Sequence, residues 1–393
     1  MKHRSLGMLA LLAGLLLALT LLVACSSSSD STSSSDESPQ APTTVKVGFA
    51  APLTGDNALY GQGMRRAVEL AIEEANASQE AKDAGYTFVL RAEDDQGDPK
   101  QAVNVANLLV SDPGVVGIVG HFNSGCSIPA SAVYYRAKMP MVSVSSNPAL
   151  TANGYGNVNR IVAKDDAQGA YAAKLVKDKL ALTKVAIVDD STPYGQGLAA
   201  EFEKTFTELG GTIVAREQIQ SKAVDFSALV TKLKADNPQA IYYAGALNEG
   251  ALIAKQSKEG GLNVPLIGGD MIYSPDFIKI AGAKNAEGDI ATALGLPLEQ
   301  QPKGNEFKEK YQAKFNKDPE AYDSYAYDSA WIIVRSVLAS KPKAEEVGKA
   351  IRVGTFDGVT GTVKFDGDGD NKEQIISSYQ VTNGEWVQMP LEQ

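Results

Sequence analysis

Histidine and cysteine are scarce in this chain, with two of each among 393 residues. So few thiols exclude a disulfide framework, and a zinc site of His and Cys would lack ligands unless carboxylates supplied most of them. Basic residues are also in deficit, since 37 Lys and Arg stand against 47 Asp and Glu and the formal charge is −10. A chain of this charge repels phosphate backbones, so no nucleic-acid partner is expected.

The rest of the composition is that of an ordinary soluble globular protein, with 44% hydrophobic and 21% charged residues. At roughly 100–200 residues per domain, the length allows two or three domains. After Ala24, no apolar run in the sequence is long enough to cross a membrane.

The first 25 residues have the features of an export signal. A basic start at residues 2–4 precedes an apolar run at residues 6–24. The run ends in Leu22-Val23-Ala24-Cys25, which resembles a bacterial lipobox, whose Cys is lipidated and becomes the mature N-terminus. We therefore predict a lipoprotein signal peptide at 1–24 and, at 25–44, the lipidated Cys25 followed by a Ser-rich tether. An uncleaved membrane anchor is the alternative.

Beyond this signal, His121 and Cys126 are the remaining residues of their kinds in the sequence. A His-dependent triad therefore has one candidate position, and a single thiol cannot form an internal disulfide. Cys126 is interpreted as a small packed residue, with a reactive thiol as the alternative.

Short apolar runs alternate with longer amphipathic stretches, the pattern of parallel sheets covered by helices. The predicted strands are 45–51, 87–93, 115–120, 140–144, 184–188, 212–217, 240–244 and 264–268. The predicted helices are 63–77, 99–111, 126–138, 167–180, 197–209, 226–235 and 249–259. This order indicates two βα sheets in succession.

The segment Tyr60-Gly61-Gln62-Gly63 is repeated as Tyr194-Gly195-Gln196-Gly197. Each copy follows a predicted strand and opens a helix, which favours two related lobes; two similar helix starts are the alternative.

Three predicted strands end in polar residues, at the edge where such sheets bind ligands. They are followed by His121-Phe122-Asn123-Ser124-Gly125, by Ser145-Ser146-Asn147-Pro148 and by Gly269-Asp270. Hydroxyls and free N–H groups suit a carboxylate, and a lone carboxylate suits an ammonium group. The combination predicts a site for a zwitterion, whereas each residue taken singly is explained by turn formation or helix capping.

Other ligand motifs are absent from the sequence. The run Asp366-Gly367-Asp368-Gly369-Asp370 is similar to a calcium loop, but Asn371 and Ser377 stand where that loop needs Gly and Glu, so we interpret it as a turn. Neither G-x-G-x-x-G nor G-x-x-x-x-G-K-[ST] occurs, and no cofactor or metal is expected.

From about Val45 onward, the sequence resembles the Leu/Ile/Val-binding family, the type I periplasmic binding proteins that serve branched-chain amino-acid ABC transporters. The motifs that carry this resemblance are Val45-Lys46-Val47-Gly48, Pro52-Leu53-Thr54-Gly55, Tyr60-Gly61, Asp94-Asp95, Asp98-Pro99-Lys100-Gln101-Ala102, Gly117 to His121, Pro148, Leu150-Thr151, Gly154-Tyr155, Tyr194-Gly195, Asp225-Phe226 and Phe365-Asp366 to Gly369-Asp370. The resemblance implies an α/β fold of two doubly wound, parallel-sheet (Rossmann-like) lobes joined by three hinge crossings. It implies an N-terminal lobe of 45–164 plus 292–368 and a C-terminal lobe of 165–291 plus 369–393.

The resemblance also implies roles for individual residues. Ser124 and Ser146 would hold a ligand carboxylate, while the Val144 carbonyl, the Ser146 hydroxyl and Asp270 would hold its ammonium group. The residues that would line or close the side-chain pocket are Tyr60, Phe122, Tyr194 and Tyr322. Aromatic walls suit this role because they bury apolar ligand area. Asn123 and Ala246 are also predicted as ligand-binding positions.

Two features of the sequence depart from the family pattern. Some relatives carry a disulfide at the positions of Gly97 and Asn123, so no such bridge is expected here. Ala246 stands where leucine-preferring relatives place a Tyr, which weakens the case for leucine and admits a larger or differently shaped side chain.

The resemblance implies a lipid-anchored, extracytoplasmic binding protein, not an enzyme, that delivers a branched-chain or other hydrophobic amino acid to an ABC permease and its ATPase subunits. A monomer is expected. The alternatives are a sensor or receptor module of the same fold, a binder of an aromatic acid or amide, and an exported hydrolase using Ser124 or Ser146 with His121. No G-x-S-x-G elbow surrounds either serine.

Overall fold

The computed structural model describes residues 41–390. The predicted signal peptide at 1–24, the lipidated Cys25 and most of the tether lie outside the described residues. Among residues 41–390, none of the helices combines the length and apolar character that a membrane span requires.

The first sheet has the strand order β2-β1-β3-β4-β5, and all neighbouring strands are parallel. Its strands are β1 (Thr43–Ala51), β2 (Tyr86–Asp94), β3 (Val115–Gly120), β4 (Met141–Ser143) and β5 (Val158–Arg160). Every residue of β3 is buried, which is typical of a central strand covered on both faces.

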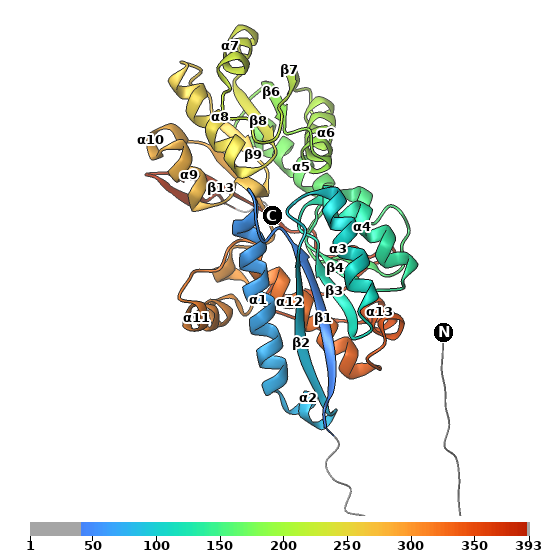
Figure 1. Ribbon diagram of the computed structural model, residues 1–393. Helices are drawn as coiled ribbons and strands as arrows, with labels where there is room; N and C mark the ends of the chain where they lie inside the picture. Colours follow the sequence, from blue (N-terminus) through green and yellow to red (C-terminus); the bar gives the residue numbers. More distant parts are fainter. Residues whose placement is uncertain (1–40, 391–393) are drawn as a thin grey trace, which may run out of the picture. The chain divides into compact units, whose positions relative to one another are not determined.

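The helices that pack with this sheet come from two stretches of the chain, and together they form the first lobe (Figure 1). They are α1 (Ala58–Ala77), α2 (Gln79–Asp83), α3 (Pro99–Ser111), α4 (Ser124–Arg136), α11 (Gly304–Phe315), α12 (Asp323–Ala339) and α13 (Ala344–Val353). A small hairpin, β11 (Phe356–Asp357) and β12 (Thr362–Val363), follows α13.

The second sheet has the order β14-β13-β10-β9-β8-β6-β7. Its strands are β6 (Lys184–Asp189), β7 (Thr212–Gln218), β8 (Ala240–Ala244), β9 (Leu266–Gly268), β10 (Ile290–Leu294), β13 (Ile376–Thr382) and β14 (Glu385–Gln388). The helices α5 (Asp165–Lys174), α6 (Pro193–Glu208), α7 (Ser227–Asp236), α8 (Leu247–Glu259), α9 (Pro275–Ala281) and α10 (Ala283–Ala286) complete the second lobe. A π-helical turn, Leu175–Lys179, extends α5.

The predicted α/β fold of two sheets is confirmed, and each predicted strand forms within two residues of its expected bounds. The second sheet is not wholly parallel, however, because β13 and β14 pair antiparallel at its edge. These strands are joined by Asn383 and Gly384, whose φ values of 54° and 80° form the tight hairpin turn that only an antiparallel pair can use.

Helices α1 and α6 begin at Ala58 and Pro193, before their predicted starts at residues 63 and 197. Gly61 and Gly195 therefore lie in the first turns of these helices. A Cβ added to Gly61 would lie 2.0 Å from the Pro52 carbonyl oxygen, and one added to Gly195 would lie 2.5 Å from that of Ala244. These glycines therefore let the first turn of each helix pack closely against strand-end backbone.

The chain leaves one sheet for the other at three places. The first crossing lies between β5, which ends at Arg160, and α5, which begins at Asp165. The predicted boundary at residue 292 falls inside β10, which pairs with β13 as far as Leu294, so the chain leaves the second sheet only after that residue. The third crossing follows Asp370, which still forms a parallel bridge with Arg160.

Candidate functional site

Loops at the carboxyl ends of the strands surround a cavity of about 20 Å³. Its lining residues are Phe122, Asn123, Ser124, Val144, Ser146, Tyr194, Asp270, Met271 and Tyr322. Eight of the ten residues that the sequence predicts as ligand-binding are therefore brought together, and they come from both lobes. Met271 was not predicted, because an apolar residue after a strand carries no sequence signal of its own.

One half of the cavity is suited to an anion. Ser124 is the first residue of α4, and the Asn123 side chain does not cap this helix. The first N–H groups of a 13-residue helix carry partial positive charge, which favours a carboxylate. The Ser124 hydroxyl oxygen is held by the Asn147 N–H at 3.4 Å, which joins this helix start to the loop after β4.

That loop supplies a second pair of polar groups. Val144 and Ser146 both line the cavity, and within residues 41–390 neither the Val144 carbonyl nor the Ser146 N–H is bonded to another backbone group. The Ser146 carbonyl accepts a hydrogen bond from the Asp165 N–H at 3.0 Å, so this carbonyl is engaged by the start of α5. One acceptor and one donor are thus available to a ligand from adjacent residues.

The other half of the cavity is acidic. Asp270 follows β9, is only 5% exposed, and accepts a 2.8 Å hydrogen bond from the Tyr194 hydroxyl and a second one from the Tyr322 hydroxyl. Burial raises the pKa of Asp270 above its ordinary value, although the two tyrosine hydroxyls oppose that shift. A buried acid of this kind becomes more favourable when a cationic group of a ligand approaches it.

Three aromatic rings cover one side of the site. The ring of Tyr60 stacks on Phe122 with centroids 5.2 Å apart, and Tyr322 packs edge-on against both rings, at 5.4 and 4.9 Å. The Tyr60 hydroxyl donates to the Met271 carbonyl at 2.7 Å. Because Tyr60 lies on α1 and Met271 follows β9, this bond joins the two lobes directly.

A larger cavity of about 700 Å³ adjoins the site, with Asp270 and Tyr322 in both linings. Its walls also include Tyr273, Leu294 and Trp386. The smaller cavity has room for about one water molecule, whereas bound small molecules generally occupy hundreds of cubic ångströms. Entry of an amino acid therefore requires the contacts from Tyr60 and Tyr322 to the second lobe to open.

Two predicted residues do not line the small cavity. Tyr60 lies behind it, in contact with Phe122 and Tyr322. Ala246 is the residue before α8, where its N–H donates to Asp190 at 3.0 Å and its carbonyl accepts from the Tyr243 hydroxyl at 2.9 Å. These backbone bonds fix Ala246 at the helix start, and the structure does not bring it to the cavity.

Asp165 is a residue of this region whose chemistry the sequence did not reveal. It is fully buried at the start of α5, and burial raises its pKa to about 8, although the nearby Ser146 hydroxyl opposes that shift. Neither of its carboxylate oxygens has a hydrogen-bond partner among residues 41–390. In the sequence, Asp165 was notable only because it lies where the chain was predicted to cross between the lobes. That position does not indicate whether its side chain is buried.

The side chains of His121 and Cys126 do not line the small cavity. His121 is fully buried, with Nδ1 2.7 Å from an Asp95 oxygen and Nε2 2.9 Å from the Tyr134 hydroxyl. Both ring nitrogens are thus occupied, and neither contacts Ser124 or Ser146. Cys126 is buried in α4, where burial raises the pKa of its thiol and keeps it protonated.

Comparison with known proteins gives a consistent match over the described part of the chain. Residues 44–385 match the family described as periplasmic binding protein. Leu/Ile/Val-binding protein homolog 2 of Brucella abortus is 38% identical over 345 residues, which cover 87% of this chain and 91% of that protein. The leucine-, isoleucine-, valine-, threonine- and alanine-binding protein of Pseudomonas aeruginosa is 33% identical, over 86% and 90% of the two chains.

Solved structures extend the match to the fold. A leucine-binding protein from Thermotoga maritima superimposes with a TM-score of 0.81 at 28% identity, over 88% of this chain and 98% of that one. The branched-chain amino-acid transporter substrate-binding protein of Streptococcus pneumoniae, solved with isoleucine, gives a TM-score of 0.80 at 28% identity, over 88% and 100%.

Proposed function

The chain belongs to the periplasmic binding protein family, and from that membership we propose that it captures a branched-chain or similar hydrophobic amino acid between its two lobes for an ABC importer. The observation that carries this proposal is that one side of the cavity is suited to an anion and the other side to a cation. The start of α4 and Ser146 belong to the first lobe, and Asp270 belongs to the second.

A zwitterion satisfies both sides of the cavity at once. Its carboxylate would accept hydrogen bonds from the Ser124 and Ser146 hydroxyls and from N–H groups at the start of α4. Its ammonium group would donate to the Val144 carbonyl and to the Asp270 carboxylate. The ligand would therefore bridge the lobes, and its binding energy would favour their closed arrangement.

The side chain of the ligand would lie against the rings of Phe122 and Tyr322, with Tyr60 packed behind them. Aromatic faces bury apolar area without offering a hydrogen-bond partner to it, which suits leucine, isoleucine or valine. The two relatives named above, from Brucella abortus and Pseudomonas aeruginosa, carry leucine, isoleucine and valine in their names.

Family membership implies an extracytoplasmic location. We further propose that Cys25 carries a lipid anchor, that the protein acts as a monomer, and that an ABC permease with its ATPase subunits receives the ligand. It would act as a binding protein and not as an enzyme, because the named relatives are binding proteins and both His121 nitrogens are bonded away from the serines.

Isothermal titration of the mature protein against the twenty amino acids tests this proposal. We expect saturable binding of at least one of L-leucine, L-isoleucine and L-valine at one site per chain, with the ligand recovered unchanged. Failure of all three to bind would refute the proposed ligand class, and formation of a product would favour an enzyme.

A further inference from the structure

Arg160, the last residue of β5, is the largest fully buried side chain among residues 41–390. Its guanidinium group donates to the Ser145 carbonyl at 3.1 Å, to the Asn147 carbonyl at 2.7 Å, to the Thr151 hydroxyl at 2.6 Å and to Asp370 at 2.9 Å. Burial of a cation is costly unless it is paired and hydrogen-bonded, and here every nitrogen of the guanidinium has a partner.

Two of these partners flank Ser146, the residue that would bind the ligand carboxylate. The C=O of Ser145 and the N–H of Ser146 belong to one planar peptide unit, in which they point in opposite directions. Because Arg160 holds the Ser145 carbonyl, the Ser146 N–H must point away from Arg160. Ser146 lines the cavity, so this orientation aims its N–H toward the ligand side of the loop.

The same loop positions the second anion-binding residue. The Asn147 N–H donates to the Ser124 hydroxyl oxygen, and the Ser145 hydroxyl donates to the Phe122 carbonyl at 2.7 Å. A change in the loop at 145–147 would therefore also displace the start of α4. Arg160 thus holds both halves of the proposed carboxylate site while lining none of the cavity itself.

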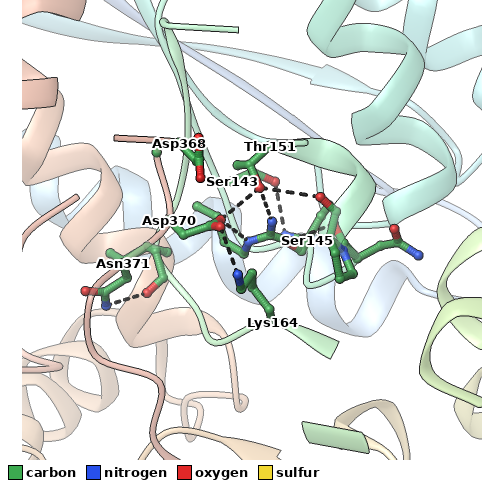
Figure 2. A network of polar contacts seen from close by, with 12 residues as sticks. Ser143, Ser145, Thr151, Lys164, Asp368, Asp370 and Asn371 are labelled. Atoms are coloured by element: carbon green, nitrogen blue, oxygen red, sulfur yellow. Dashed lines mark hydrogen bonds and ion pairs between the residues drawn. The ribbon is translucent and has the colours of Figure 1, made fainter. Parts of the chain in front are cut away.

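Asp370 connects this arrangement to the third crossing. Figure 2 shows Asp370 between Thr151 and Lys164; Thr151 donates to it at 3.0 Å, and the Lys164 nitrogen lies 3.3 Å from its other oxygen. The backbone is tied as well, since the Arg160 N–H donates to Gly369 and its carbonyl accepts from Asn371. Lys164 belongs to the first crossing, so two of the three crossings meet at one carboxylate.

We propose that Arg160 is a positioning residue, which presets the loop at 145–147 for an α-carboxylate and, through Asp370, couples that loop to the crossings on which the lobes hinge. This inference rests on the proposed function and adds to it the residue that gives the site its selectivity for a carboxylate. Arg160 acts from behind the loop, so its removal should change which ligands bind and not only how stable the protein is.

The test compares L-leucine with L-leucinol, which keeps the ammonium group and the side chain but lacks the carboxylate. The unaltered protein should prefer leucine strongly. Arg160→Lys keeps the charge but cannot make the fork of bonds to two carbonyls, so we expect leucine affinity to fall about tenfold or more, with leucinol affinity changed less than about twofold.

Thr151→Val and Asp370→Asn keep the test decisive if Arg160→Lys does not fold. Thr151→Val removes one hydrogen-bond acceptor of Arg160, and Asp370→Asn removes the negative charge that pairs with it. Neither alters the loop at 145–147, and each should reduce the leucine preference by a smaller factor. Lys138→Met serves as the matched control, because its ion pair with Glu345 is exposed and it lines no part of the cavity. It should leave both affinities unchanged.

The possible outcomes separate this inference from the proposed function. Equal losses of leucine and leucinol affinity in folded Arg160 or Asp370 variants would assign Arg160 a purely structural role and overturn the inference. Failure of the unaltered protein to bind leucine, isoleucine or valine would instead overturn the proposed function. A selective loss of leucine binding, with circular dichroism unchanged, would support both.

Discussion

Replacement of Asp270 by Asn should separate ligand affinity from stability. Asn has nearly the same shape as Asp. Its amide oxygen can still accept the hydrogen bond from one of the two tyrosine hydroxyls, Tyr194 or Tyr322, and its NH2 group can donate to the oxygen of the other. It cannot supply the negative charge that the proposed ammonium group requires. The change therefore removes one charge from a site that is almost fully enclosed.

The expected loss follows from the burial of Asp270. A hydrogen bond to a charged group contributes about 1.5–3 kcal/mol, and at 5% exposure little solvent screening reduces this value. Because about 1.4 kcal/mol corresponds to a tenfold change, Asp270→Asn should weaken binding of L-leucine by about ten- to a hundredfold.

The ligand-free protein should respond in the opposite direction. Burial raises the pKa of Asp270, so the folded state holds its proton more tightly than the unfolded chain does. The unfolded chain loses that proton near pH 4, and above this value ionisation of the buried acid lowers the free energy of unfolding. At pH 8, Asp270→Asn should therefore be at least as stable as the unaltered protein.

Titration calorimetry with L-leucine and urea denaturation, both at pH 8, measure the two effects. Asp289→Asn is the control, because Asp289 is also a buried acid with a pKa raised to about 7, but it bonds to Leu266 at the opposite end of β9. It should leave leucine affinity unchanged. Leucine binding by Asp270→Asn within twofold of the unaltered protein would show that Asp270 does not contact the ammonium group.

Three further predictions concern the rest of the site and its surroundings. Ser124→Ala should weaken L-leucine about two- to tenfold with little effect on L-leucinol, and calorimetry that finds equal losses would remove Ser124 from the carboxylate site. Tyr60→Phe deletes the bond to Met271 between the lobes, so leucine should dissociate faster and bind about two- to tenfold more weakly; an unchanged dissociation rate by stopped flow would contradict a role in closure. Because burial raises the pKa of Asp165 to about 8, the free energy of unfolding should fall between about pH 4 and pH 8, by at most about 1.4 kcal/mol per pH unit from this group. Asp165→Asn should flatten that dependence in urea denaturation, and an unaltered slope would mean that Asp165 is ionised throughout.

The alternation of apolar strands and amphipathic helices was sufficient to predict the α/β fold and eight of the twelve strands in the two sheets, but β5, β10, β13 and β14 were not predicted. It predicted them because burial on both faces requires continuous apolar runs, which are local features of the chain. The antiparallel edge was missed, since the direction in which β13 pairs depends on where the chain re-enters the second sheet. The lobe boundary predicted at residue 292 was wrong for the same reason: the extent of β10 depends on its pairing with β13, which lies far away in the sequence.

By itself, the sequence determined the chemistry available to the site: hydroxyls and free N–H groups for an anion, one acid for a cation, and aromatic residues beside them. These properties belong to residue types and to their places after strands. Only the tertiary structure decided which of these residues meet, because hydrogen bonding and burial depend on groups far apart in the chain. Asp370 pairs with Arg160 across 210 positions, and Met271 meets Tyr60 across 211. Nothing local to Arg160 indicates that it lies behind the loop at 145–147, just as nothing local to Ala246 indicates that it lies away from the cavity.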